Sequence, residues 1–333
     1  MKLLLAGFGF IGKNFIRAVN EKITLLKSVD RDFKVVGVAT SQGVLYSSRG
    51  LDVDKLSRLE KASQYGEEFE FGGSVKEFLE EGAADIIVVA TPTNIETGEP
   101  GLTYIRTALK NGVDVVTADK GPLVLEFWEL TRLAERNGRY LMYEATVAAA
   151  LPIFSLYREC LQADRIIRIS GILNGTTNYI LSKMFFEGTS FELSLKEAQE
   201  RGYAEKDPSY DVDGIDAACK VVILGNSIMG KNWKFEDVKR IGIRKITPEA
   251  VELAKKSGYA IKLVGVVDDK PEVSPRMVPL RHPLCVHGNL NAVHFETDLA
   301  GEITVIGYGA GRETVSAVLN DVISILRDRT RNV

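Results

Sequence analysis

The residue types best suited to chemistry gather between positions 171 and 220. An eight-residue stretch, Gly171-Ile-Leu-Asn-Gly-Thr-Thr-Asn178, is followed by Glu205, Asp207, Asp216 and Lys220. Small polar and ionisable residues rarely lie between strongly apolar segments, because burying a charge without a partner is costly. Clusters of ionisable residues in such surroundings are candidates for functional sites. The pattern therefore indicates an active site.

Asp216 and Lys220 are four residues apart in segment 214–226, whose apolar residues have helical spacing. Side chains at this spacing project side by side. An exposed ion pair that adds little to stability is the simpler interpretation. However, the flanking residues are small or apolar, so we expect the lysine to be partly desolvated and suited to proton transfer.

A glycine-rich segment near the N-terminus supplies a second functional element. Gly7-Phe-Gly-Phe-Ile-Gly12 follows a short apolar run and opens a helical pattern. In this context Gly7 permits a tight turn, Gly9 admits a pyrophosphate, and Gly12 allows helix and strand to pack closely. A plain strand–helix turn is the alternative. We expect a dinucleotide to bind the glycines and the adjoining Phe10 and Ile11, at the helix N-terminus.

The choice of cofactor depends on the end of the second apolar run, residues 35–39. Asp30 and Asp32 precede this run, so they belong to the loop before the strand. The strand then ends without a carboxylate that would repel a 2′-phosphate. Arg49 or Lys55 could reach such a phosphate, although solvated surface charge is an equal alternative. We therefore expect NADP to be accepted and preferred, with NAD possible.

Two further segments follow apolar runs at positions where ligands bind in open α/β sheets. Thr91 and Thr93 come after the run 85–90, and Lys120 comes shortly after the run 113–117. The carboxyl ends of parallel strands form the ligand-binding edge of such sheets. We expect these three side chains to contact the cofactor, although Lys120 could also be one exposed loop lysine among many.

The order of apolar runs and helical patterns predicts the fold class. Four apolar runs alternate with helical segments up to residue 117, which indicates an α/β domain with a Rossmann-type doubly wound parallel sheet. Later runs with one polar face indicate a second, α+β catalytic and dimerisation domain, an open sheet with helices on one face. We expect a dinucleotide-binding domain over 1–145, the catalytic and dimerisation domain over 146–305, and a C-terminal helix over 306–333 that returns to the first domain.

Composition excludes several classes of protein. The chain has 333 residues, and its net charge of -3 argues against a general nucleic-acid binder. Cys160, Cys219 and Cys285 follow no metal or redox spacing. No apolar run approaches the ~20 residues needed to cross a membrane, and residues 1–10 are too short for a signal peptide. We expect a cytoplasmic protein.

The motifs together closely resemble homoserine dehydrogenase, and the similarity spans nearly the whole chain. The matching segments are Gly171–Ile180, Gly202–Pro208, Gly214–Lys220, Thr117–Lys120, Glu144–Pro152 and Gly309–Gly311. The resemblance implies NAD(P)-dependent interconversion of L-homoserine and L-aspartate 4-semialdehyde, on the route to threonine, methionine and isoleucine. It also implies a homodimer. The chain ends soon after its last helix, so we expect the short form without a C-terminal regulatory domain and without threonine feedback through it.

The resemblance also implies roles for individual residues. Lys220 would be the general acid/base for the substrate hydroxyl, and Asp216 and Glu205 would hold the substrate ammonium. Lys120 would lie beside the nicotinamide and the substrate. Gly311 would contact the cofactor, although the segment from Gly311 to Thr314 is one residue shorter than the usual pattern.

A monovalent-cation site is implied by the same resemblance. Glu144 and the main-chain carbonyls of Val147, Ala149 and Leu151 would hold sodium, a hard cation that favours oxygen ligands. Many family members have glycines where this chain has alanines. Main-chain ligands tolerate this replacement only if the backbone dihedral angles at these alanines are ordinary.

Two other functions remain as alternatives. A semialdehyde oxidoreductase in which a thiol attacks the aldehyde would need a cysteine beside a histidine, and no such pairing is evident. A nucleotide-sensing binding protein would be free to lose the lysine and carboxylates, yet they are present. His282, His287 and His294 have no zinc-site spacing.

Overall fold

The computed structural model describes residues 1–66 and 68–331. The chain forms two compact units, which are described separately. Unit 1 comprises residues 1–146 and 311–333, and unit 2 comprises residues 147–310. The last helix of the chain therefore belongs to the same unit as the N-terminal strands.

Unit 1 is built on a seven-stranded sheet in the order β4-β3-β2-β1-β5-β6-β7. The strands are β1 (Lys2–Ala6), β2 (Lys34–Thr40), β3 (Gly43–Tyr46), β4 (Phe69–Phe71), β5 (Ile86–Val89), β6 (Asp114–Thr117) and β7 (Leu141–Met142). Five of them are parallel, and β3 and β4 extend the sheet with antiparallel pairing. The parallel part confirms the predicted Rossmann-type sheet.

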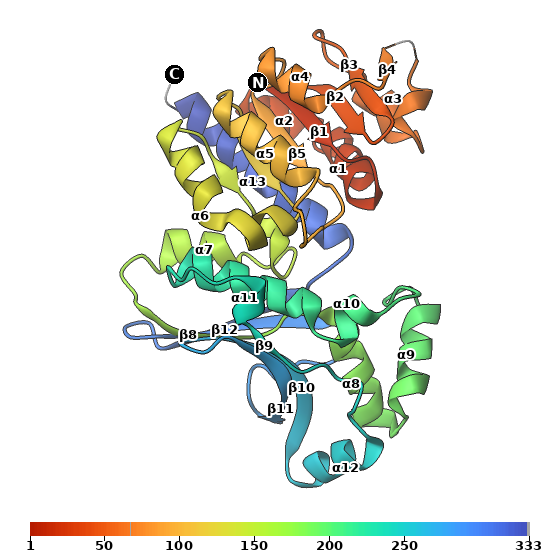
Figure 1. Ribbon diagram of the computed structural model, residues 1–333, viewed down its shortest axis with the longest axis vertical. Coiled ribbons are helices and arrows are strands. Elements are labelled where there is room, and N and C mark those ends of the chain that lie inside the picture. The colour runs from red at the N-terminus through yellow and green to blue at the C-terminus, as the bar shows by residue number, and fades with distance from the viewer. Residues whose placement is uncertain (67, 332–333) are drawn as a thin grey trace. The chain divides into compact units, whose positions relative to one another are not determined.

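Helices cover the sheet of unit 1 in the expected alternation (Figure 1). They are α1 (Phe10–Glu21), α2 (Ile23–Val29), α3 (Val53–Ser57), α4 (Val75–Glu80), α5 (Gly101–Lys110), α6 (Gly121–Arg136) and α13 (Arg312–Arg331), with 3-10 turns η1 (Ala62–Gln64) and η2 (Glu144–Thr146). Val318 and Val322 of α13 share one apolar core with Leu3 and Ile16. Arg329 of α13 also binds the buried carboxylate of Asp114, with an N–O distance of 2.7 Å. These contacts attach helix α13 to the seven-stranded sheet of unit 1.

Unit 2 contains a six-stranded mixed sheet in the order β13-β12-β8-β10-β11-β9. The strands are β8 (Ile166–Ile172), β9 (Lys239–Arg240), β10 (Tyr259–Val267), β11 (Glu272–Pro279), β12 (Leu290–Thr297) and β13 (Glu302–Tyr308). The helices are α7 (Ile153–Cys160), α8 (Gly175–Glu187), α9 (Phe191–Glu200), α10 (Ser209–Val212), α11 (Ile215–Ile228) and α12 (Pro248–Lys256), with η3 (Phe235–Asp237). All pairings in this sheet are antiparallel except the short β9–β11 contact.

The expectation that helices cover only one face of the second sheet was wrong. Gly265 on β10 faces α11, because a Cβ built there would lie 2.9 Å from Val221. Lys262 is three residues away on the same strand, so it points to the opposite face, and it contacts Asn178 on α8. Helix α8 thus packs against the face that α11 does not cover (Figure 1).

The strands that the sequence did not reveal are short or exposed. β3 and β4 have four and three residues, and β13 has no buried residue. Their apolar signal is weak because they lie at or next to a sheet edge. No helix within the described residues is long and apolar enough to span a membrane.

Candidate active site

Lys220 and Asp216 form a buried ion pair on α11 in unit 2. Each residue is 7% exposed. The Nζ of Lys220 lies 2.7 Å from Oδ2 of Asp216 and donates a second hydrogen bond, at 2.6 Å, to the carbonyl oxygen of Leu173. The predicted i, i+4 juxtaposition and the desolvation of the lysine are both present. The amine is held by one charged and one neutral acceptor.

Asn174 joins this pair to a second buried acid. Its Nδ2 donates to Oδ1 of Asp211 at 2.6 Å and to Oδ2 of Asp216 at 3.0 Å. Its Oδ1 accepts from the main-chain N of Thr177 and so caps α8. Burial, together with the charge of Asp216, raises the pKa of Asp211. Elements α8, α10 and α11 therefore meet where the carboxylates of Asp211 and Asp216 flank the amide of Asn174, and Figure 1 shows these three helices together.

Sequence reasoning did not single out Asn174 or Asp211 as site residues. The motif around Asn174 was recognised, and an asparagine directly before a helix is a typical N-cap, so this residue was within reach. Asp211 lies in α10, a helix of only four residues. Its contact with Asn174 joins positions 37 residues apart, and no local pattern encodes such a contact.

Glu205 and Asp207 lie in the exposed loop between α9 and α10. The main-chain carbonyl of Glu205 accepts a hydrogen bond from Nε2 of Gln199 at 3.0 Å. Oδ1 of Asp207 accepts from the main-chain N of Ser209 at 3.1 Å. The loop is thus fixed through its backbone, and the role of the Glu205 side chain stays a prediction.

The glycine-rich loop of unit 1 links β1 to α1, and each glycine has a distinct surrounding. A Cβ on Gly7 (φ 103°) would lie 2.4 Å from the carbonyl oxygen of Ala90, and one on Gly12 would lie 2.0 Å from that of Gly7. By contrast, no atom lies within 4 Å of a Cβ built on Gly9. The turn therefore requires two of the glycines, whereas the third leaves open space at the helix N-terminus. This cradle fits a pyrophosphate, with Phe10 exposed and Ile11 partly buried at its rim.

Asp119 organises the carboxyl edge of the same sheet. Its Oδ2 accepts from Oγ1 of Thr91 at 2.8 Å, and its Oδ1 accepts from the main-chain N of Gly121 at 3.0 Å. Burial raises its pKa to about 6, against the opposing effects of hydrogen bonds from Thr91, Gly121 and Thr93 and the charge of Lys120. The predicted residues Thr91, Thr93 and Lys120 thus surround a buried carboxylate that the sequence did not single out.

The end of β2 carries no carboxylate, as expected. Asp30 lies before the strand and binds the N-terminal ammonium of Met1. Lys55 lies over the ring of Tyr65, with Nζ 4.2 Å from the ring centroid, and Arg49 is exposed. The structure thus provides two cations in the segment after β3, and the preference for NADP stays a prediction.

The residues of the predicted cation site belong to both units and are described within each. In unit 1, Glu144 is 6% exposed and its main-chain N donates to Oδ2 of Asp321 at 3.0 Å. In unit 2, the carbonyl oxygen of Leu151 accepts from the main-chain N of Ile153 at 2.9 Å, and Val147 is buried. A buried carboxylate and main-chain carbonyls are suitable ligands for a hard cation.

The condition that the dihedral angles at the alanines be ordinary is not met, which counts against the predicted cation site. Ala148 and Ala149 have φ values of 56° and 50°, in the left-handed region that favours glycine. A side chain there clashes with the following carbonyl, at a cost of roughly 1–2 kcal/mol per residue. The turn keeps the geometry that glycines adopt easily, although alanines occupy it.

Other predicted positions occupy defined places. Gly311 has a φ of 86° and its carbonyl oxygen accepts from the main-chain N of Thr314, at the start of α13. Within residues 1–66 and 68–331, no three His, Cys, Asp or Glu residues are grouped to hold a metal ion. Cys219 is buried and its Sγ lies 3.5 Å from the hydroxyl of Tyr210.

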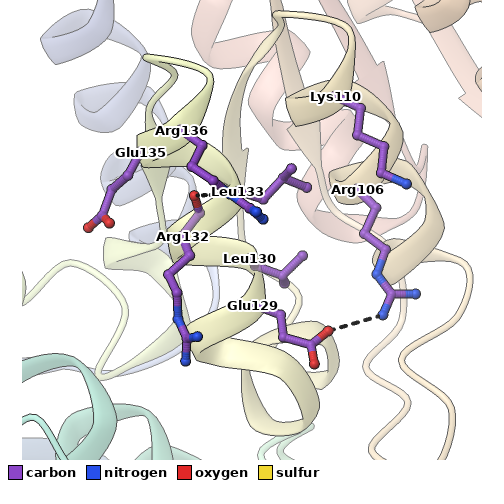
Figure 2. Close-up of a pocket in the computed structure, with 8 residues that line it drawn as sticks. All are labelled: Arg106, Lys110, Glu129, Leu130, Arg132, Leu133, Glu135 and Arg136. Carbon is purple, nitrogen blue, oxygen red and sulfur yellow. Dashed lines mark hydrogen bonds and ion pairs between the residues drawn. The ribbon is translucent and has the colours of Figure 1, made fainter.

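A groove of about 450 Å³ lies between α5 and α6 of unit 1 (Figure 2). Arg106 and Lys110 of α5 face Glu129, Leu130 and the basic residues of α6 across it. Its charges partly pair with one another, as in the 3.7 Å contact of Arg106 with Glu129. The groove is lined by the C-terminal halves of two helices that begin at the carboxyl edge. It is therefore separate from the glycine-rich loop and from Lys120.

Comparisons with known proteins agree with this geometry. Residues 7–144 match the family model described as homoserine dehydrogenase, NAD binding domain, and residues 152–323 match the model described as homoserine dehydrogenase. A homoserine dehydrogenase of Methanocaldococcus jannaschii is 46% identical over 98% of both chains.

Solved structures are also similar over almost the whole chain. A putative homoserine dehydrogenase from Archaeoglobus fulgidus is 42% identical, with a TM-score of 0.90 over 98% of this chain and 99% of that chain. A mutant hyperthermophilic archaeal homoserine dehydrogenase in complex with NADPH is 30% identical, with a TM-score of 0.83 over 97% and 96%. The chain belongs to the homoserine dehydrogenase family, NAD(P)-dependent oxidoreductases that act on a CH–OH group.

Proposed function

We propose that Lys220 is the general acid/base of the homoserine dehydrogenase reaction and that Asp216, with Glu205, holds the substrate ammonium. In the oxidation of L-homoserine, the carbon bearing the hydroxyl gives up a hydride while the hydroxyl oxygen gives up a proton. A nicotinamide cofactor held at the loop between Gly7 and Gly12 would supply the hydride acceptor. Lys220, as the general base, accepts the proton at Nζ, and the C=O bond of the semialdehyde forms as the O–H and C–H bonds break.

One observation carries this proposal. The Nζ of Lys220 lies between Oδ2 of Asp216 and the carbonyl oxygen of Leu173 in a buried environment. Two fixed acceptors orient the amine, and burial removes the competing water. Asn174 spaces the two neighbouring carboxylates, so that they offer a cationic substrate group a binding place without direct repulsion between them. Lys120 at the carboxyl edge of unit 1 would lie beside the reacting groups.

The deciding experiment compares Lys220→Met with the wild type in a spectrophotometric assay of homoserine oxidation. General acid–base catalysis contributes about 10²–10⁴-fold, so we expect kcat to fall by that range. Cofactor affinity, measured by fluorescence quenching, should not change. Lys256→Met is the matched control, because Lys256 forms an exposed i, i+4 pair with Glu252 on α12. Wild-type turnover in Lys220→Met would refute the role of this lysine.

We further propose that unit 1 is the dinucleotide-binding domain and that it prefers NADP to NAD. The loop between Gly7 and Gly12, the edge residues Thr91, Thr93 and Lys120, and the turn at Gly311 would contact the cofactor. The absence of a carboxylate at the end of β2 and the nearby cations Arg49 and Lys55 support the preference. If the kcat/KM values with NADP and NAD are nearly equal, the proposed preference for NADP would be refuted. A much higher kcat/KM with NAD would show the opposite preference.

A monovalent cation, sodium, is proposed to bind Glu144 and the carbonyl oxygens of Val147, Ala149 and Leu151. The buried carboxylate and the oxygen-only ligand set support this site. Binding to the folded state alone raises the melting temperature. We expect NaCl to raise it relative to choline chloride at equal ionic strength, and Glu144→Gln to abolish the difference. An equal melting temperature in both salts for the wild type would contradict the site.

The protein is also proposed to be a cytoplasmic homodimer whose second sheet forms the contact, which makes unit 2 the catalytic and dimerisation domain. Edge strand β13 exposes Ile306 and Tyr308, 49% and 53% of whose surfaces are accessible. An exposed, apolar edge strand is a typical site for pairing. Cys160, Cys219 and Cys285 form no disulfide, which suits a reducing compartment. Light scattering should give twice the chain mass, and Ile306→Lys should shift the protein toward the monomer.

A further inference from the structure

A lysine that the reaction does not use lies at the centre of unit 2. Lys262 on β10 is 1% exposed. Its Nζ contacts Oδ1 of Asn178 at 2.7 Å, Oγ of Ser182 at 3.3 Å and Nδ1 of His287 at 3.3 Å. An ammonium has three N–H donors and no acceptor. All three donors can therefore be used, and none of these three partners carries a negative charge.

The elements around Lys262 place few charges near it. On β11, Arg276 lies opposite Lys262 in the strand register. Segment 285–287 contributes Cys285, whose Sγ lies 3.8 Å from Nε2 of His287. The expectation that no cysteine has a neighbouring histidine was therefore wrong, but burial raises the pKa of this thiol and so disfavours the nucleophilic thiolate. Burial lowers the pKa of His287 to about 4, so its ring is neutral and accepts at Nδ1. On α12, Lys255 binds the far end of α8.

Keeping an ammonium in these surroundings is unfavourable. Burial lowers the pKa of Lys262 to about 8, an effect that the nearby Cys285 only partly opposes. A methionine has a similar length and would fill this space without desolvating a charge. The hydrogen bonds that Lys262 makes are therefore the reason for a lysine at this position.

Those hydrogen bonds act on the helix that begins at the candidate active site. Asn178 is held by Lys262 on one side, and its Nδ2 donates to the carbonyl oxygen of Leu290 on β12 at 2.9 Å. The main-chain N of Asn178 donates to the carbonyl oxygen of Asn174, one turn earlier. Asn174 in turn binds Asp211 and Asp216. A chain of bonds thus runs from β10 through the first turn of α8 to the acids beside Lys220.

We propose that Lys262 is a positioning residue for the reaction: by fixing Asn178 it sets the rotation and depth of α8, and thereby the places of Asn174 and the Leu173 carbonyl. It does not touch the substrate. The inference rests on the proposed role of Lys220, because the two groups that Lys262 positions are the ones that hold Lys220 and Asp216.

The test compares Lys262→Met and Lys262→Gln with the wild type. A small misplacement of reacting groups costs on the order of 10²-fold, so kcat of Lys262→Met should fall by about that factor. The KM for the cofactor should not change, since the proposed cofactor contacts lie in unit 1. Glutamine retains an N–H donor toward Asn178, so Lys262→Gln should recover part of the loss.

The pH dependence separates positioning by the ammonium from simple packing. The wild type loses this ammonium as the pH rises through about 8. The ratio of wild-type to Lys262→Gln kcat should therefore be largest near pH 7 and should shrink toward pH 9.5. The contribution of every other group, common to both proteins, cancels in this ratio. A ratio that stays constant with pH, or wild-type kcat in either folded variant, would overturn the inference.

A matched control and a second variant complete the design. Lys255 on α12 donates to the carbonyl oxygen of Phe185, at the far end of the same helix, so Lys255→Met should leave kcat unchanged. If Lys262→Met is recovered unfolded, Lys262→Gln decides alone. Failure of Lys220→Met to lose activity would refute the proposed function. If Lys220→Met loses activity while the Lys262 variants keep the wild-type kcat, only the positioning role of Lys262 would be refuted.

Discussion

Two buried carboxylates, Asp216 in unit 2 and Asp119 in unit 1, are held in different ways. In unit 2, Lys220 and Asp216 form a close ion pair, and Asn174 extends it to Asp211. In unit 1, the buried Asp119 is bound by a hydroxyl and a main-chain amide, and its pKa rises to about 6. One region holds an acid beside a buried cation. The other satisfies a carboxylate with neutral donors.

The difference reflects two tasks. Proton transfer needs a charged or chargeable group at a fixed place with little water around it, and the cluster around Lys220 provides that. Binding a dinucleotide needs main-chain donors and open space, and the glycine-rich loop provides both. The carboxylate of Asp119 serves this second task by tying the loop after β5, at Thr91, to the start of α6, at Gly121.

The strongest change should follow when the amide between the two acids of unit 2 is removed. In Asn174→Ala, Asp211 and Asp216 lose their shared donor, and the helix loses its cap. We expect kcat to fall by about 10²-fold, the scale of a misplaced catalytic group. Asn174→Ser keeps an oxygen that can cap the helix but cannot bridge the acids, so it should lose nearly as much activity with a smaller loss of stability.

Ser190→Ala is the matched control for the cap alone. Ser190 caps α9, and its Oγ accepts from the main-chain N of Leu193. This change should lower stability by about 1 kcal/mol, as N-cap losses usually do, without changing kcat. If Asn174→Ser has wild-type kcat, the bridge between the acids is not needed, and the two units differ less than proposed.

A second test concerns Asp119, whose neutral partners make it sensitive to pH. Its folded-state pKa of about 6 lies above the ordinary 3.8, so the folded protein gains a proton before the unfolded chain does. Above pH 6 the charged carboxylate therefore lowers the stability of the folded protein. This destabilisation disappears as the pH falls toward 4, because Asp119 becomes protonated in the folded protein. When the pH falls from 7 to 5, the free energy of unfolding of the wild type should rise by about 1.4 kcal/mol relative to that of Asp119→Asn.

Urea unfolding of both proteins at pH 7, 6 and 5 measures this gain. The comparison of the two proteins removes the contribution of all other groups that titrate in this range. Asp211 is a useful second site, since burial and Asp216 also raise its pKa. A free-energy difference that does not depend on pH would show that Asp119 is better solvated than its burial implies.

The sequence predicted those parts of the site that depend on spacing within one element. The four-residue offset of Asp216 and Lys220 places them together on any helix, and the glycines of the loop reveal their turn because only glycine fits at Gly7 and Gly12. Buried parallel strands such as 86–89 were evident from their continuous apolar runs.

The parts that depend on contacts between distant segments were not predictable. Asp119 meets Thr91 across 28 positions, and Lys262 meets Asn178 across 84. In neither pair does the sequence pattern around one residue indicate which distant residue it will contact. Strand β13 was missed for a different reason: its residues are exposed or partly exposed, so it lacks the alternation that a half-buried strand shows.

The smallest expected effect concerns backbone strain, which the two units also treat differently. Unit 1 places glycine in the left-handed turn after β1 (Gly7, φ 103°), whereas unit 2 places Ala149 in a left-handed turn at φ 50°. Ala149→Gly should relieve roughly 1–2 kcal/mol of strain and lose about 0.4–1 kcal/mol through the freer unfolded chain. We therefore expect a net gain between about zero and about 1.6 kcal/mol, seen as a higher urea midpoint. Ala254→Gly, within α12, is the control and should lose about 1 kcal/mol. If both variants lose stability alike, the turn at Ala149 carries no strain, and the contrast with Gly7 does not hold.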